Sequence, residues 1–400
     1  MRPLLRSALG ALEAVAANLS IAFLAVSTLA AELPGGHVLL RDAVSDDGRI
    51  VAAFAPQPPD RCWLLRLFER EQERDRWAPV AERAGPAKPR SGDCPPVIGV
   101  LAGNGRTVAI GTPWEKRVTV LEREGRGFRE LGRIEIPGEL DKPFPPPAQT
   151  LAISRDGNAL LVGAPHHDCV VGVPEDVCGT AFLFLREGGT WRAAVRFPRP
   201  AEGSPTDRFG RTVALSGDDG TVLVGGPGSY GRAGRLWVYE RAPDGEWDLV
   251  GALESPAPGD LEFAAEVAID DLGETVAVAG EQKVVLFRRE SGSWPHLATL
   301  GSSDPLIGTF GGAVALSGTG RVLVVGAPRS ACPQDQMGSR CGAVRLFELR
   351  PGEGRLGVGE PQALEPVVWL PMADFGWRVA ADAAGRLVAV QGRLAHLYAR

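Results

Sequence analysis

Two histidines and an aspartate stand side by side at the start of a loop near the middle of the chain. His166, His167 and Asp168 directly follow Pro165, the end of a Gly-Ala-Pro tripeptide. Imidazole and carboxylate groups bind metals and polar ligands, but two adjacent histidines do not easily reach one ion. We therefore predict a ligand-binding contact without a metal here. Ordinary solvated loop residues are the alternative interpretation.

Tyr230, Arg329 and Asp335 are assigned to the same binding surface, because they lie in loops that the repeats described below place on one face. No catalytic constellation is evident beside them. The sequence has no G-x-S-x-G elbow, and no carboxylate pair stands out among its 49 acidic residues. The prediction is a protein without catalytic residues, cofactor or metal.

Four of the six cysteines occur in two matched pairs. Cys169 and Cys178, and likewise Cys332 and Cys341, lie nine positions apart after a Gly-Ala-Pro tripeptide, and Gly follows the second cysteine of each pair. Matched placement of this kind predicts a loop-closing disulfide in each pair. Free thiols or a metal site are the alternative, which the absence of any C-x₂-C pair disfavours.

The remaining cysteines are Cys62 and Cys94. Cys62 occupies the place of a second cysteine, in the run CWLLRLF, and Cys94 lies in a connection on the same expected face. We predict a third disulfide between them. Three disulfides predict an oxidising compartment, so we expect the protein to be secreted or displayed at the cell surface.

A short phrase that recurs seven times must position all of these residues. Its clearest copies are FGRTVALSGDDGTVLVGGP, from residue 209 to 227, and FGGAVALSGTGRVLVVGAP, from residue 310 to 328. Each copy is an alternating apolar run, a Gly-containing turn and a second apolar run, which is the pattern of a β-hairpin. The turn glycines are Gly48, Gly105, Gly157, Gly220, Gly273, Gly320 and Gly385.

Each hairpin is followed by a third strand-like run, such as residues 344–347, and in most copies by a fourth run that begins at an aromatic residue. Four strands in each of seven units predict an all-β fold, a seven-bladed β-propeller of four-stranded antiparallel blades. A linear β-solenoid is the alternative. The long and uneven spacing of the turns disfavours it.

The two clearest phrases resemble the FG-GAP repeat, the blade unit of the integrin alpha-chain N-terminal β-propeller. Phe375-Gly376 and Gly163-Ala164-Pro165 carry halves of the same phrase. The resemblance implies a propeller in which Phe packs between blades and Gly lets strands approach closely. Integrin-type blades often hold calcium in an aspartate-rich loop. The turns here have at most two adjacent carboxylates, such as Asp270-Asp271, so we expect no calcium.

The N-terminal segment supports two interpretations. Residues 1–18 have a helical or targeting composition, residues 19–36 contain the apolar run LSIAFLAVSTLAA, and the propeller is expected over residues 37–400. As a signal peptide, the apolar run would be cleaved near Ala30. As structure, it would supply the outer strand that the last blade lacks, and we then expect residues near 22–30 to pair there.

Composition fits this fold and narrows the function. The hydrophobic fraction of 44% suits a globular protein, and 51 Gly and 33 Pro suit many turns. A net charge of −6 without a basic cluster argues against nucleic acid as a partner. The sequence contains no uninterrupted apolar run of about 18 residues, so it predicts no stable membrane span.

We expect a monomeric extracytoplasmic binding or scaffold module. It would recognise a protein or glycan through the face that carries the disulfide-closed loops. A carbohydrate-active hydrolase or lyase with its site at the central channel is the alternative. Two or more carboxylates at the channel mouth, with shifted pKa values, would favour the enzyme.

Overall fold

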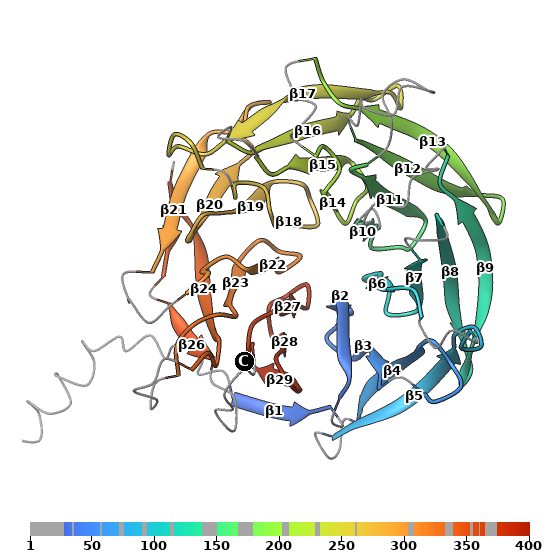
Figure 1. Ribbon diagram of the computed structural model, residues 1–400. Coiled ribbons are helices and arrows are strands. Elements are labelled where there is room, and N and C mark those ends of the chain that lie inside the picture. Colours follow the sequence, from blue (N-terminus) through green and yellow to red (C-terminus); the bar gives the residue numbers. More distant parts are fainter. Residues whose placement is uncertain are drawn as a thin grey trace, which may run out of the picture.

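β-Strands form all the regular structure in the described part of the chain, and their sheets stand around a common axis (Figure 1). The structure is a computed structural model. It describes residues 28–33, 36–56, 58–71, 76–89, 94–112, 116–137, 150–166, 179–201, 208–228, 233–260, 262–302, 308–332, 339–352, 355–359, 361–364 and 374–400. The fold is all-β, as the sequence predicts, with several four-stranded antiparallel sheets arranged as in a β-propeller.

Three consecutive sheets each contain four strands in chain order, with the first strand nearest the axis (Figure 1). Their strands are β10 (Thr150–Ile153), β11 (Ala159–Ala164), β12 (Thr180–Glu187) and β13 (Thr190–Pro198); β14 (Thr212–Leu215), β15 (Thr221–Gly226), β16 (Arg235–Arg241) and β17 (Trp247–Glu254); β18 (Val267–Ile269), β19 (Thr275–Gly280), β20 (Lys283–Arg288) and β21 (His296–Gly301). Each sheet begins with one of the predicted hairpins.

Two further four-stranded units precede these sheets. They are β2 (Val38–Val44), β3 (Ile50–Ala55), β4 (Leu64–Glu71) and β5 (Arg76–Ala84), followed by β6 (Ile98–Leu101), β7 (Thr107–Thr112), β8 (Arg117–Glu124) and β9 (Gly127–Glu135). A parallel bridge between Arg41 and Val100 joins their innermost strands into one eight-stranded sheet.

The chain ends with two more sheets. The first contains β22 (Ala313–Leu316), β23 (Val322–Ala327), β24 (Ala343–Gly352), β25 (Arg355–Val358) and β26 (Gln362–Leu364), with both short strands paired to β24. The second contains β27 (Arg378–Ala381), β28 (Leu387–Gln391), β29 (Ala395–Ala399) and, at its outer edge, β1 (Thr28–Glu32).

The outer strand of the last sheet comes from the other end of the chain. β1 runs antiparallel to β29, with Thr28 opposite Ala399 and Glu32 opposite His396. The pairing predicted near residues 22–30 falls partly outside the described residues, which begin at Thr28. The observed contact lies slightly further along the chain.

The hairpin turns between the two innermost strands of each unit are joined in a closed circle. The backbone N–H of one turn donates to a carbonyl of the next turn, at 2.8–3.2 Å. The donor and acceptor pairs are Asp46 to Gly103, Asn104 to Arg155, Arg155 to Gly217, Asp218 to Asp271, Asp271 to Gly318, Thr319 to Ala383 and Ala383 to Asp46. The last bond returns to the first turn, so the circle is complete at this end of the axis.

Apolar side chains fill the space between neighbouring sheets. The second strand of a hairpin is buried along its length, as in β15 and β23. Phe209, the aromatic residue of the repeated phrase, is fully buried and packs with residues of the β10–β13 sheet and of its own sheet. Phe of this phrase therefore lies between sheets, as the sequence predicts.

Aspartates in the hairpin turns stabilise the turns themselves. Oδ1 of Asp47, Asp156 and Asp218 accepts a hydrogen bond from the serine hydroxyl two residues earlier, at 2.6, 2.7 and 2.6 Å. Each also accepts a backbone N–H two residues further on, which is a local Asx turn. No group of three or more His, Cys, Asp or Glu side chains among the described residues is placed to hold a metal ion. The described residues also contain no helix that could cross a membrane.

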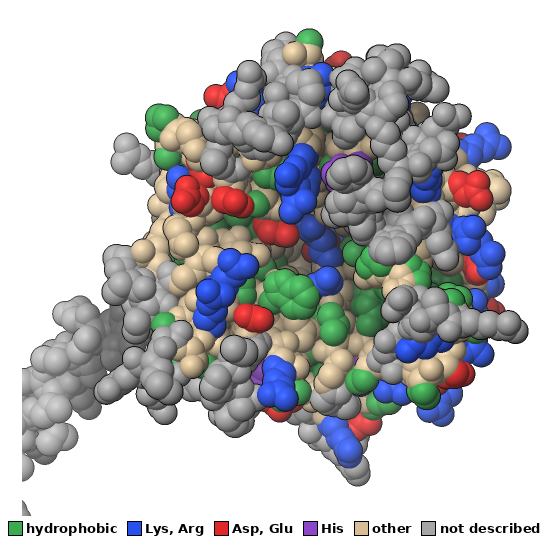
Figure 2. Space-filling model, in the orientation of Figure 1, with side chains coloured by type: hydrophobic (Ala, Val, Ile, Leu, Met, Phe, Trp, Pro, Cys, Tyr) green, Lys and Arg blue, Asp and Glu red, His purple; other side chains and the backbone are tan. Residues whose placement is uncertain are grey.

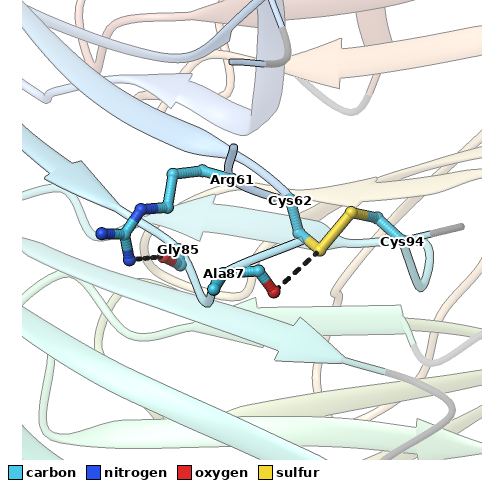
Figure 3. The surroundings of a disulfide bond; sticks show 5 residues. All are labelled: Arg61, Cys62, Gly85, Ala87 and Cys94. Carbon is cyan, nitrogen blue, oxygen red and sulfur yellow. Dashed lines mark hydrogen bonds between the residues drawn. A yellow bond between two sulfur atoms is a disulfide. The ribbon is translucent and has the colours of Figure 1, made fainter. Parts of the chain in front are cut away.

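A disulfide joins the first two four-stranded units on the face where their innermost strands begin. Cys62, before β4, is bonded to Cys94, before β6, with their Cα atoms 5.2 Å apart. Figure 3 shows this bond beside Ala87 and Gly85, the latter accepting a hydrogen bond from the Arg61 guanidinium at 3.4 Å. The predicted pairing of these two cysteines is confirmed.

A second disulfide, Cys332–Cys341, closes the loop between β23 and β24, with a Cα–Cα distance of 4.9 Å. The carbonyl of Cys341 accepts a hydrogen bond from the backbone N–H of Phe375, at 3.0 Å. The loop is thus tied to the segment that leads into β27. This predicted bond is confirmed as well, whereas Cys169 and Cys178 lie outside the described residues. Two disulfides are consistent with an extracytoplasmic location.

Candidate functional site

The innermost strands surround a central cavity of about 380 Å³. Its wall is apolar where the innermost strands end. The residues there are Val44, Leu101, Ile153, Leu215, Ile269, Leu316 and Ala381. Charged side chains line the cavity on either side of this apolar collar, so polar chemistry is confined to its two ends.

A bulge in β2 turns two charged residues into the cavity. Leu39 pairs with Ala53 and Val44 with Val51, so four residues of β2 stand opposite one residue of β3. Asp42, inside the bulge, has a φ of 48°, a left-handed conformation that Asp adopts more readily than most residues. Bulges of this kind redirect side chains, and Arg41 and Asp42 both line the cavity.

Five residues form what we call the mouth cluster: Arg41, Asp42, Glu266, Trp377 and Arg378, all on the cavity wall. Nη2 of Arg41 lies 3.1 Å from Oε2 of Glu266, which directly precedes β18. This ion pair therefore links two non-adjacent sheets. The cluster lies where the innermost strands begin, which is also the face with the two disulfides.

Arg378 is held against the wall of the mouth. Its Nη1 donates a hydrogen bond to the carbonyl of Leu39 at 3.0 Å. Its guanidinium carbon lies 5.7 Å from the ring centroid of Trp377, a cation–π contact. Trp377 is 55% exposed, which is unusual for so large an apolar side chain. Figure 2 shows hydrophobic, basic and acidic side chains gathered near the centre of one face.

Burial changes the protonation of the mouth cluster. It raises the pKa of Asp42; the Arg41 charge opposes this shift, and the Glu266 charge adds to it. The Asp42 side chain is nevertheless exposed to solvent in the cavity. Burial likewise lowers the pKa of Arg378, with further lowering by the Arg41 charge. A carboxyl group whose pKa is raised keeps its proton to a higher pH than an ordinary aspartate does.

The opposite end of the cavity holds a second charged group. Arg155 forms ion pairs with Asp46 and Asp271. Burial raises the pKa of Asp46 to about 6, and the Asp271 charge adds to this shift. Burial raises the pKa of Asp271 too.

The residues that the sequence suggested as a binding surface are not brought together in the described part of the chain. His166 is half-buried after β11, where burial and the charges of Arg208 and Arg211 lower its pKa. Arg329 is exposed after β23, in another sheet. Neither is among the described residues that line the cavity. His167, Asp168, Tyr230 and Asp335 lie outside the described residues.

Sequence reasoning missed the mouth cluster. The run VLLRDAV of β2 shows no sign of a bulge, and Arg41 meets a residue more than 200 positions away. The other charged group could have been found, because Asp46, Arg155 and Asp271 occupy the same position in the turns of the first, third and fifth units. Alignment of the turns would have placed them on one circle.

Comparisons with known proteins address the fold. No family model matches the sequence, and no curated protein matches it. The Cps50 (Swd1) β-propeller domain of Myceliophteria thermophila has a TM-score of 0.56 at 10% identity, covering 94% of this chain and 99% of that chain. At this identity the likeness shows the fold alone, and that fold is a β-propeller.

Two other similar structures carry enzyme names. A putative 6-phosphogluconolactonase from Bacteroides uniformis has a TM-score of 0.53 at 17% identity, over 82% of this chain and 84% of that chain. The Pseudomonas aeruginosa periplasmic gluconolactonase PpgL has a TM-score of 0.52 at 15% identity, over 80% of this chain and 83% of that chain. The prediction that this chain is not an enzyme is contradicted by these comparisons. The mouth contains two carboxylates, those of Asp42 and Glu266, and burial raises the pKa of Asp42.

Proposed function

We propose that this chain is a carbohydrate-active hydrolase whose site is the mouth of the central cavity. The observation that carries the proposal is the placement of Asp42, by the β2 bulge, beside the Arg41–Glu266 ion pair in a cavity that raises its pKa. Hydrolysis needs a group that exchanges protons near neutral pH. The names of the two lactonases with a similar fold make a sugar lactone the first substrate class to test.

In this proposal Asp42 acts as a general base. Its carboxylate takes a proton from water while the water oxygen forms a bond to the carbonyl carbon of the lactone. The Arg378 guanidinium stabilises the negative charge that develops on the carbonyl oxygen. When the ring C–O bond breaks, Asp42 returns its proton to the leaving oxygen. The product is the open hydroxy acid, and every proton is accounted for.

Trp377 and Glu266 have supporting roles. The exposed part of the indole of Trp377 offers an apolar surface for the C–H groups of a sugar ring. Glu266 holds Arg41 by its ion pair, so the positive charge of Arg41 is shared between two carboxylates. Asp42 therefore keeps a basicity that a dedicated arginine partner would abolish.

We also infer a ring of seven blades related to the FG-GAP propellers. The closed circle of hydrogen bonds between hairpin turns and the buried phrase residues Phe209 and Phe375 support it. The two disulfides support export of the protein from the cytoplasm.

A second proposal is recognition of a protein or glycan by the disulfide face. The observation that favours it is the hydrogen bond from Phe375 to Cys341, which ties a stapled loop to the segment that carries Trp377.

Hydrolysis can be tested with the purified oxidised protein and a panel of sugar lactones and aryl glycosides. We expect Asp42→Asn to lower kcat at least about 100-fold, the contribution typical of a general base. Asp248→Asn, which changes an exposed carboxylate on the outer strand β17, is the matched control and should stay within about twofold. No turnover of any substrate, or equal rates for the two variants, would refute the proposal.

A further inference from the structure

Arg155 ties together three hairpin turns at the end of the cavity opposite the mouth cluster. Its Nε pairs with Oδ2 of Asp46, and its Nη1 lies 3.3 Å from Oδ2 of Asp271. Asp46 follows β2, Arg155 follows β10 and Asp271 follows β18, so the three side chains come from the first, third and fifth units. We call these three residues the septum. Their ion pairs can form only by spanning the axis.

The backbone around the septum is small and fixed. The circle of hydrogen bonds described above passes through all three septum residues. Three of the remaining turns carry glycine at the same position, namely Gly103, Gly217 and Gly318. A Cβ atom on Gly103 would overlap the carboxylate of Asp46, and one on Gly217 or Gly318 would overlap that of Asp271. The aspartates therefore fill the space over the glycines.

The septum has a separate depression on its outer side. Asp46, Gly103, Arg155 and Gly217 line the central cavity and also line a second, shallow cavity on the turn face. The side chains of Asp46 and Asp271 are 21% and 23% exposed, whereas that of Arg155 is 54% exposed. Arg155 thus faces outer solvent while its two partners are mostly covered. These shared residues lie between the central cavity and the outer depression.

We propose that Asp46, Arg155 and Asp271 close the central cavity at the turn face, so that it admits a small molecule or the end of a chain from the mouth face alone. The substrate class in this inference rests on the proposed function. A linear polymer cannot pass along the axis of such a cavity. Arg155 is a specificity-determining residue here and takes no part in the chemistry.

Crystal structures test the closure without any need for turnover. The probe is ordered water in the wild type and in the variant Asp46→Gly/Arg155→Gly/Asp271→Gly. The variant carries at these three turns the glycine that three other turns have at the same position. We expect no connected file of water past Arg155 in the wild type and a connected file in the variant. Asp219→Gly/Arg241→Ala is the control, because it removes an ion pair of 3.4 Å from the same face but outside the central cavity.

A connected file of water through the wild-type septum would overturn the inference. If the triple variant does not fold, the wild type and the single variant Arg155→Ala still decide the question. If no sugar substrate is turned over, the proposed function fails, while the crystal structures still settle the septum.

Discussion

Nδ1 of His396 lies 3.1 Å from Oε1 of Glu32, and this contact joins the first described strand to the last strand of the chain. His396 is buried, and its ring meets that of Phe375 edge-on at 5.3 Å between centroids. Burial lowers the pKa of His396, although the Glu32 charge opposes the shift. Burial therefore favours the neutral imidazole, and the contact places Glu32 of β1 beside the closing sheet.

The first prediction follows from this contact. The mature protein retains β1, so N-terminal sequencing of exported protein should find a first residue at or before Thr28. A truncated variant that starts at residue 34 should lose about 2–4 kcal/mol of unfolding free energy relative to one that starts at residue 27, because β29 loses its backbone partner. Denaturant titration measures the difference. A mature protein that begins after Ala31 and is equally stable would contradict the prediction.

The second prediction concerns pH and Asp46. Because its pKa rises from 3.8 to about 6 on folding, the folded protein binds this proton more tightly than the unfolded chain does. Asp46 therefore contributes most to stability below about pH 4, and its contribution falls as pH rises towards 6, by at most about 3 kcal/mol. In Asp46→Asn this fall should disappear. Unfolding titrations at pH 4 and 7 check it, with Asp47→Asn as a control for the turn.

The third prediction compares the two disulfides. Cys62–Cys94 spans 32 positions and Cys332–Cys341 spans 9. By the loop-entropy relation, replacing both cysteines of the first pair by serine should lower the unfolding free energy by about 3.7 kcal/mol. The same replacement of the second pair should lower it by about 2.6 kcal/mol. Loss of the second pair should also raise the KM, because the hydrogen bond from Phe375 to Cys341 supports the segment that carries Trp377. Equal KM values in the oxidised protein and the variant would show that the loop serves stability alone.

The fourth prediction concerns the glycine of the repeated Phe-Gly pair. Gly210 has a φ of 87°, and a Cβ atom there would overlap the backbone carbonyl oxygen of Thr180. Gly210→Ala should therefore destabilise the protein by at least about 2 kcal/mol. At the equivalent place in the fifth unit, Ala264 already has a φ of 67°. The reciprocal change Ala264→Gly should be neutral or stabilising, and thermal unfolding of the two variants measures the contrast.

The sequence predicts the parts of the fold that depend on short stretches of chain. Turn glycines and matched cysteines identify hairpins and loops, because the turn and the 9-residue span of Cys332–Cys341 are decided within a few residues. The mouth cluster depends on a bulge and on Arg41 meeting Glu266 across the ring. The alternating apolar pattern of a strand looks the same in the sequence with or without a bulge. Contacts between residues more than 200 positions apart leave no signal in the local sequence. The sequence therefore located the repeats and missed the site.

The bulge in β2 makes the backbone of one unit around the axis different from that of the other units. Every other innermost strand pairs with its neighbour without a change of register, so the backbone around the axis is similar from one unit to the next. Arg41 and Asp42 occur in a single sector only. A molecule held at the mouth consequently has one preferred orientation about the axis, in which one particular part of it faces Asp42.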